Sequence, residues 1–258
     1  MMNRVAAALA RILPSVAALA LAILLASVWW GRLHYPFDLE WMEGGMLAHA
    51  WRISHGLPLY VAPNPEFVPF VYPPGYSAVV AAIGAVVGLE LPVGRGVSIA
   101  AIVAAAAAIG FAVRRSGGPW VVAAAAAMAF LGTYPQAGAF YDIVRPDALS
   151  VALAGWAVVL GAEPGRRAAI GAGLLLAAAF LVKQNEALLG LPIALGIALR
   201  SPRDAAAFVA ASAGPALAAV GLLEWSSGGG FLTWMLAVPA SHVLLWPRGY
   251  LDTPREWG

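Results

Sequence analysis

The stretch Phe37-Asp38-Leu39-Glu40-Trp41-Met42-Glu43-Gly44-Gly45-Met46 places three carboxylates among aromatic side chains, directly after an apolar run at 13–30 that is long enough to cross a bilayer. We interpret that run as a retained first membrane span. If the acidic stretch is helical, Glu40 and Glu43 are three residues apart and share one face, so both point toward one place. The alternative is that Asp38 caps a helix whose dipole the two glutamates complement.

The composition is that of an integral membrane protein. Of the 258 residues, 62% are hydrophobic and 11% are charged, with a mean hydropathy of +0.81, whereas soluble domains carry about 25% charged residues. The net charge of +2 comes mainly from arginines in short loops, which orient spans and form no nucleic-acid surface. The chain has no cysteine, which excludes disulfides and thiolate metal sites.

The arginines predict the orientation of the chain. Arg4 and Arg11 precede the first span, so the positive-inside rule predicts a cytoplasmic N-terminus and an outward-facing acidic stretch. An apolar helix is expected at 75–88. If it lies along the outer surface without crossing, all later paired arginines fall in the cytoplasm, and we therefore predict a surface helix. These arginines are Arg114, Arg115, Arg166, Arg167, Arg200 and Arg203.

The remaining apolar runs predict an all-α polytopic membrane protein with about seven spans. The six later spans are expected at 96–113, 119–134, 148–162, 168–182, 187–199 and 205–223. As one helix, 168–199 would be roughly 48 Å long, too long for one crossing, so 183–186 is expected to be an outer turn. We expect a single membrane domain over 1–258, with a first outer loop at 32–95, six spans at 96–223 and the start of an outer loop at 224–258.

Two further polar clusters, at 141–147 and 183–186, return to the outer side of the predicted spans. Charge at the end of a span is costly unless it is hydrated, paired or used, so three clusters on one side predict a single polar cavity. The alternatives are structural. Asp142 could pair with Arg145 while Asp147 caps the next span, and Lys183 could be an interfacial lysine with its amine in water.

The histidines do not predict a metal site. His49 and His55 are six residues apart and do not share a helix face, and no metal-binding motif accompanies them. The sequence requires no cofactor and leaves a divalent cation open. The stretch 225–246 resembles an aromatic interfacial loop, with His242 as its one titratable group.

An ordered set of motifs resembles the N-terminal half of the C-type membrane glycosyltransferases. It is most similar to bacterial family 39 members related to dolichyl-phosphate-mannose protein mannosyltransferase and aminoarabinose transferase. Family chains are longer and have further spans, so we expect an incomplete module. The motifs are Glu40 to Gly45, Gly56-Leu57-Pro58-Leu59-Tyr60, Tyr72-Pro73-Pro74, Asp142 to Asp147, and Lys183-Gln184.

The resemblance implies that the first outer loop carries the catalytic acid. Glu43 falls on the Glu of an Asp-Glu-Gly pattern, but Met42 stands where many members have Asp, so Glu43, Glu40 and Asp38 are all candidates. The second outer loop and the Lys-Gln pair match positions of the family's further polar residues. The expected substrate-binding residues are Asp142, Arg145, Asp147, Lys183, Gln184 and His242.

The implied reaction moves a sugar from a polyprenyl-phosphate donor to a lipid, glycan or protein acceptor at the outer face of the bacterial inner membrane. An outer carboxylate would accept the acceptor's proton, while Arg145 and Lys183 would stabilise the departing phosphate. One displacement inverts the anomeric carbon, and a covalent intermediate ranks lower. Other possibilities are a transporter or lipid-handling scaffold, and a catalytically silent partner subunit.

Overall fold

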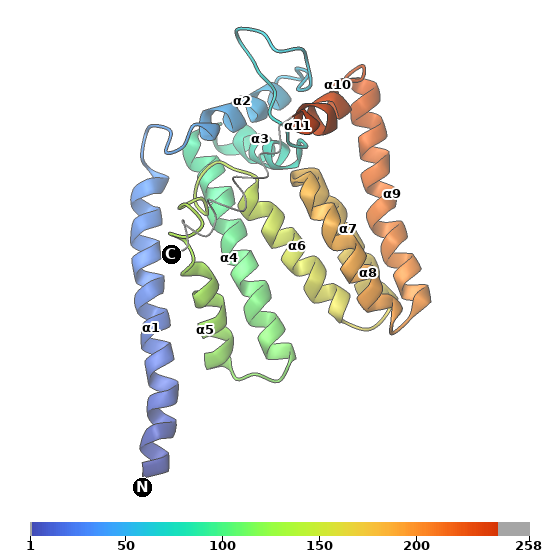
Figure 1. Ribbon diagram of the computed structural model, residues 1–258. Helices are drawn as coiled ribbons and strands as arrows, with labels where there is room; N and C mark the ends of the chain where they lie inside the picture. Colours follow the sequence, from blue (N-terminus) through green and yellow to red (C-terminus); the bar gives the residue numbers. More distant parts are fainter. Residues whose placement is uncertain (1, 242–258) are drawn as a thin grey trace.

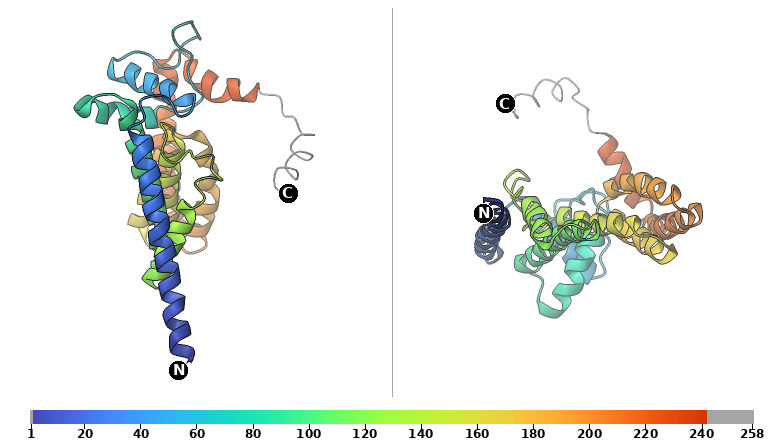
Figure 2. Two further views of the ribbon diagram at one scale, coloured as in Figure 1. Left: turned by 90° about the vertical axis from the view of Figure 1, so that its left-hand side faces the viewer. Right: turned by 90° about the horizontal axis from the view of Figure 1, so that it is seen from below.

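The computed structural model describes residues 2–241, and this part of the chain is helical, with one isolated β-bridge between Asn64 and Phe67 and no strand. The predicted all-α class is therefore confirmed. α1 (Met2–Leu33) contains the predicted first span and stands at one edge of the helix bundle, with the N-terminus at its lower end (Figure 1; Figure 2).

Two helices of the first loop lie across the upper ends of the bundle (Figure 1). α2 (Met42–Ser54) and α3 (Gly75–Val87) pack against each other, and α3 also contacts α4 and α7. The segment between them, 55–74, contains six prolines, which remove hydrogen-bond donors and prevent a continuous helix. The two helices thus form a cap over one end of the bundle.

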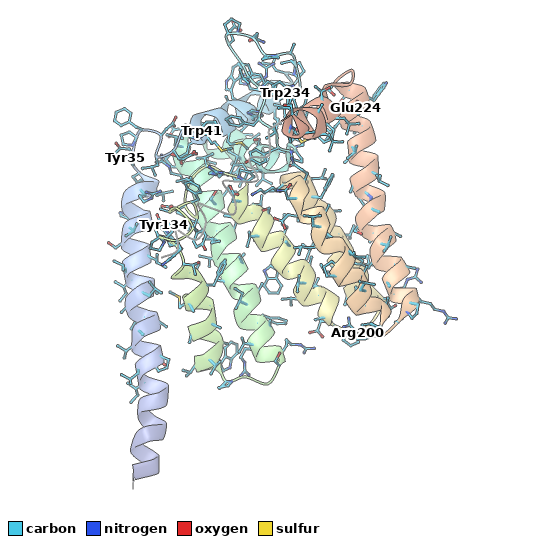
Figure 3. The ribbon with its side chains drawn as sticks, in the orientation of Figure 1. Tyr35, Trp41, Tyr134, Arg200, Glu224 and Trp234 are labelled. Atoms are coloured by element: carbon cyan, nitrogen blue, oxygen red, sulfur yellow. The ribbon has the colours of Figure 1, made fainter. Side chains whose placement is uncertain are left out.

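The bundle consists of α4 (Leu91–Arg115), α5 (Trp120–Leu131), α6 (Asp147–Ala162), α7 (Arg166–Val182), α8 (Gly190–Ala198) and α9 (Pro202–Ser226). They alternate in direction, and the α4–α5, α6–α7 and α8–α9 turns lie at the lower end (Figure 1). Arg200 marks the last of these turns in Figure 3. Gly117 and Gly165 have φ of 84° and 100° there, a left-handed conformation that glycine adopts without strain.

Every predicted span corresponds to a helix of the bundle or to α1. The run 168–199 breaks where predicted: α7 ends at Val182, and a 3₁₀ helix, η1 (Gln184–Leu189), leads into α8. Within the described residues, three segments are long and apolar enough to cross a membrane, namely Ile12–Leu33, Leu91–Arg115 and Pro202–Ser226. The protein is an integral membrane protein, and the count of seven spans stays a prediction.

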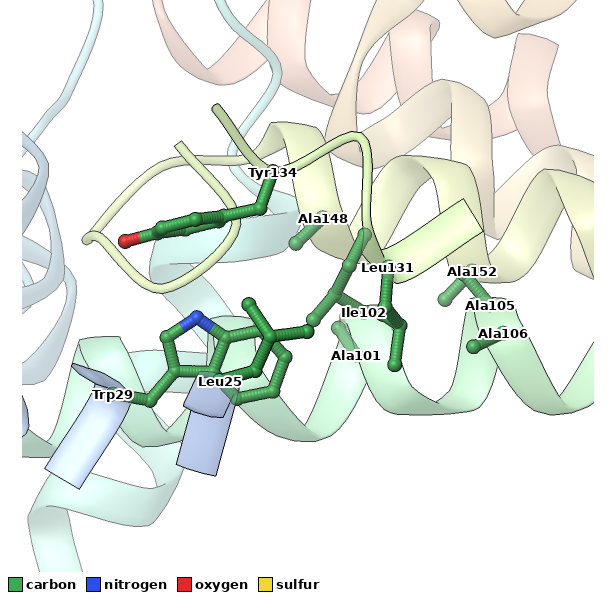
Figure 4. Packing of buried hydrophobic residues seen from close by; sticks show 10 residues of the cluster. All are labelled: Leu25, Trp29, Ala101, Ile102, Ala105, Ala106, Leu131, Tyr134, Ala148 and Ala152. Atoms are coloured by element: carbon green, nitrogen blue, oxygen red, sulfur yellow. The ribbon is translucent and has the colours of Figure 1, made fainter. Parts of the chain in front are cut away.

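The part of the core that supports α1 uses small side chains on one helix and large ones on its neighbours (Figure 4). Alanines of α4 allow close helix contact. Trp29 of α1 belongs to the same cluster and meets Tyr134 edge to face, with ring centroids 6.2 Å apart. This packing fixes the upper half of α1 against the bundle.

The chain after α9 is partly helical. α9 continues to Ser226, and 230–240 forms short helical turns: α10 (Gly230–Leu232), a π-helical turn (Thr233–Ala237) and α11 (Val238–Ala240). Gly230 is needed because a Cβ there would lie 2.1 Å from the Tyr60 carbonyl oxygen. His242 lies outside the described residues.

Candidate functional site

Glu43 is fully buried and bonded to Arg95, a residue near the start of α4. Arg95 Nε and Nη2 donate to the two carboxylate oxygens at 2.9 and 2.8 Å. The main-chain N–H groups of Leu39 and Val144 donate to the same carboxylate at 2.6 and 2.9 Å. Each oxygen of Glu43 therefore accepts two hydrogen bonds.

These bonds decide the charge state of Glu43. Burial alone would raise the pKa of its carboxyl, but the hydrogen bonds from Arg95, Leu39 and Val144 hold that pKa below its ordinary value of 4.5. A carboxylate that is buried, ionised and bonded at both oxygens is a poor acceptor for a substrate proton. Glu43 is well suited to hold the first loop in place.

Arg95 also holds the connector between α1 and α2. Its Nη1 donates to the carbonyl oxygens of Arg32 and Tyr35 at 2.9 and 2.5 Å, and its Nη2 donates to that of Phe37 at 2.7 Å. Tyr35 and Trp41 lie at the upper end of the bundle, beside the top of α1 (Figure 3). Arg95 thus fixes the backbone that presents the other two acids of the first loop.

Those two acids differ in environment. α2 begins at Met42, so Glu40 precedes the helix and does not share a helix face with Glu43. Glu40 Oε2 accepts from the Met42 N–H at 3.0 Å and lies 3.3 Å from Arg145 Nη1. Asp38 is exposed, forms no ion pair with the described residues and does not cap α2. Its Oδ2 would lie 2.9 Å from a Cβ on Gly44, which places Asp38 over the first turn of α2.

A chain of ion pairs connects three elements at this end of the bundle. Arg145 Nε donates to Asp147 at 3.0 Å, and Lys183 Nζ donates to the other Asp147 oxygen at 2.6 Å. Together with Glu40, these residues join the α2 connector, the start of α6 and the end of α7. The four side chains are 13–29% exposed, so each of these charged groups is partly accessible to solvent. We call Glu40, Arg145, Asp147 and Lys183 the ion-pair network.

Asp142 lies outside this network. It is fully buried, and it accepts from Arg32 Nε at 2.6 Å and from the Tyr134 hydroxyl at 2.9 Å. The alternative of an Asp142–Arg145 pair is therefore wrong, since Arg145 pairs with Glu40 and Asp147. Asp142 joins the loop before α6 to the end of α1.

Gln184 follows Lys183 at the start of η1. Its Nε2 donates to the Val71 carbonyl at 2.8 Å, which ties η1 to the first loop. Its Oε1 is buried and has no partner among the described residues. Gln184 thus offers one acceptor directly beside the ion-pair network.

An apolar cavity adjoins the network. Its volume is about 200 Å³, and it is lined by Ile102, Phe130, Ala137, Phe140, Tyr141, Asp147, Ala148 and Val151. Seven of its eight lining residues carry no charge, and Asp147 is the exception. The network therefore borders an apolar space through Asp147, an arrangement that suits an amphiphile with a charged head.

His49 is also buried in the first loop. Its Nδ1 lies 2.8 Å from the Gly45 carbonyl, and the Phe70 N–H donates to Nε2 at 3.1 Å, so both ring nitrogens are used by the neutral form. Burial lowers the pKa of His49 below 6.5, more than its bond to Gly45 raises it. No group of three potential metal ligands occurs within residues 2–241.

Sequence reasoning missed Arg95 and Arg32, the partners of the two buried acids. One signal could have identified Arg95: it stands in Gly94-Arg95-Gly96, at the start of an apolar helix, where an arginine needs a partner. The acid that pairs with it could not be read from spacing, because Glu43 lies 52 residues earlier.

Comparison with known proteins gives one match. The family model described as dolichyl-phosphate-mannose-protein mannosyltransferase matches residues 71–226. No curated protein and no solved structure matches the chain. The matched range begins within the first loop, just before α3, and runs to the end of α9. It includes Arg95, Arg145, Asp147 and Lys183, while the three acids of the first loop precede it.

Proposed function

The chain belongs to the dolichyl-phosphate-mannose-protein mannosyltransferase family, and from this premise we propose that it moves a sugar from a polyprenyl-phosphate donor to a hydroxyl acceptor at the membrane face opposite its N-terminus. The family supports a membrane glycosyltransferase of the C type. The class of the sugar donor, the class of the acceptor and the location of the reaction at the outer face are our proposals.

The observation that carries the proposal is the ion-pair network beside an apolar cavity. A polyprenyl phosphate has an anionic head and a hydrocarbon tail, and the two features suit these two parts. Arg145 can bind phosphate oxygens through its planar fork, while Lys183 acts as a point charge. Asp147 holds both cations in position at 3.0 and 2.6 Å.

Asp38 is the base that the geometry favours. Glu43 falls on the Glu of the family pattern, but its two oxygens are occupied by Arg95 and two main-chain N–H groups. Glu40 is partly neutralised by Arg145. Asp38 is exposed and has no ion-pair partner among the described residues, so its carboxylate can meet an acceptor hydroxyl.

The proposed reaction is a single displacement. The Asp38 carboxylate takes the hydroxyl proton as the acceptor oxygen attacks the anomeric carbon. The bond from that carbon to the phosphate oxygen breaks, and the phosphate leaves with the electron pair. Arg145 and Lys183 stabilise the negative charge that develops on it. The product has the inverted anomeric configuration.

The test uses the full chain in liposomes with a panel of polyprenyl-phosphate sugars. Asp38→Asn should lower the transfer rate by at least about 10²-fold, the usual scale for loss of a general base. Glu66→Gln is the matched control, because Glu66 is an exposed acid of the same loop with no ion pair among the described residues. Arg145→Gln should weaken donor binding.

Two results would contradict the proposal. Transfer from nucleotide sugars, with none from any polyprenyl-phosphate sugar, would exclude the donor class. Full activity of Asp38→Asn beside an inactive, folded Glu43→Gln would return the base to Glu43.

A further inference from the structure

A second apolar groove is lined by residues of α4, α5 and α6. It includes both sides of the α4–α5 turn, and this turn lies at the opposite end of the bundle from the candidate site (Figure 1). It has a volume of about 610 Å³. Its lining combines small residues with aromatic ones and ends at two arginines. The lining residues are Ala107, Gly110, Phe111, Arg114, Arg115, Trp120, Ala123, Ala124, Ala127 and Trp156.

Close helix packing shapes the groove. A Cβ on Gly110 would lie 3.4 Å from the Ala123 carbonyl oxygen, so α4 and α5 nearly touch along the small residues. On the other side, Trp156 Nε1 donates to the Ala104 carbonyl at 3.0 Å, and its ring lies 5.6 Å from that of Phe111. These contacts hold one aromatic wall of the groove in place.

Arg114 stands at the mouth with part of its guanidinium unused. Its Nη1 donates to the Gly118 carbonyl at 2.7 Å, and its Cζ lies 4.3 Å from the centre of the Trp120 ring. Among the described residues it has no carboxylate partner, and its Nε and Nη2 make no hydrogen bond. Arg115 differs, because it forms a two-bonded ion pair with Glu163. Arg114 therefore presents an oriented, uncompensated charge.

We propose that this groove binds an anionic phospholipid, with an acyl chain along the alanines and the phosphate on the free Nε–Nη2 edge of Arg114. In an integral membrane protein, an apolar groove of this kind is filled by lipid chains, and charge complementarity at its mouth selects the headgroup. Trp120 is 73% exposed and stands where an interfacial aromatic belongs. The site is separate from the proposed catalytic residues.

Native mass spectrometry of the purified full chain tests the proposal. The protein is titrated with phosphatidylglycerol and with phosphatidylcholine of the same acyl chains. The wild type should bind the first phosphatidylglycerol roughly ten-fold more tightly, the scale of one charge-assisted hydrogen bond. Arg114→Gln should lose that preference. Arg203→Gln should keep it, because Arg203 is an exposed arginine at the same end of the bundle with no ion pair among the described residues.

A second measurement does not depend on Arg114→Gln folding. Lipids brominated in the acyl chain quench the fluorescence of nearby tryptophan residues. The quenching of Trp120 is the difference between the fluorescence quenching of the wild type and that of Trp120→Phe. Stronger quenching of Trp120 by brominated phosphatidylglycerol than by brominated phosphatidylcholine supports the proposal. Equal quenching by both lipids, or equal phosphatidylglycerol affinity of the wild type and a folded Arg114→Gln, overturns it.

Discussion

Arg95 uses all five of its guanidinium N–H groups inside the protein: two on the Glu43 carboxylate and three on main-chain carbonyls. Both charged side chains of the pair are fully buried. Removing one partner of such a pair leaves an unpaired charge in the interior, which costs far more than the pair itself contributes. A substitution in the Glu43–Arg95 pair therefore measures how much the anchoring of the first loop contributes to stability.

Arg95→Gln should lower the free energy of unfolding by about 3–5 kcal/mol, the range for breaking a buried ion pair. Arg115→Gln, which breaks the exposed pair with Glu163, should cost only about 0–1 kcal/mol. Unfolding by a denaturing detergent, followed by circular dichroism, measures both. Similar losses in the two variants would show that burial does not set the strength of the Arg95 pair.

The stability of the first loop should depend on pH through His49. Its folded pKa is below 6.5, so the unfolded state binds more protons in the range just below that value. Stability is thus full above pH 6.5 and falls as the pH drops toward the folded pKa, by at most about 1.4 kcal/mol per pH unit.

The melting temperature between pH 5 and 8 tests this dependence. His49→Gln should flatten the curve, while His55→Gln, a change of the exposed histidine at the end of α2, should leave it as in the wild type. If the melting temperature of His49→Gln depended on pH as steeply as that of the wild type, the acid sensitivity would come from other groups.

At the scale of the element, the positions of the bundle helices in the sequence could be predicted, but the contacts that they make with other elements could not. Arginine, proline and glycine separate the apolar runs, so Pro119 and Pro202 mark the starts of α5 and α9 closely. The sequence analysis considered a helix that includes Glu40, but α2 begins at Met42, and Glu40 accepts from the Met42 N–H from outside the helix. Contacts such as Glu43–Arg95 depend on how α4 packs against the connector, which local sequence does not contain.

Gly75 tests how α3 packs on α7. A Cβ there would lie 2.5 Å from the Leu181 carbonyl oxygen, which is backbone and cannot turn away. Gly75→Ala should therefore lower the free energy of unfolding by about 1–3 kcal/mol, the scale of overpacking. In Gly96→Ala, the new Cβ meets nothing within 4 Å, so this helix-interior change should be neutral or stabilising by about 0.5–1 kcal/mol. Equal effects would show that α3 does not rest tightly on α7.

At the scale of the whole molecule, the arrangement of charges predicts the topology. Turns with paired arginines lie at the lower end, and the first loop with its acids lies at the upper end (Figure 1; Figure 3). Because the chain has no cysteine, single cysteines report accessibility without background. In intact cells, an impermeant thiol reagent should label Asn64→Cys and leave Ser116→Cys and Ser201→Cys unlabelled. Labelling of Ser116→Cys from outside would reverse the orientation.

The order of synthesis gives the Arg95 contacts a further meaning. All its acceptors, from Arg32 to Glu43, leave the ribosome before their donor does. The carbonyl groups of the connector that Arg95 binds therefore lack this donor until the start of α4 arrives. Assembly of the end of the bundle that carries the ion-pair network is thus coupled to the arrival of the second long apolar helix at the membrane, and a nascent chain halted before Arg95 should expose this connector to proteases.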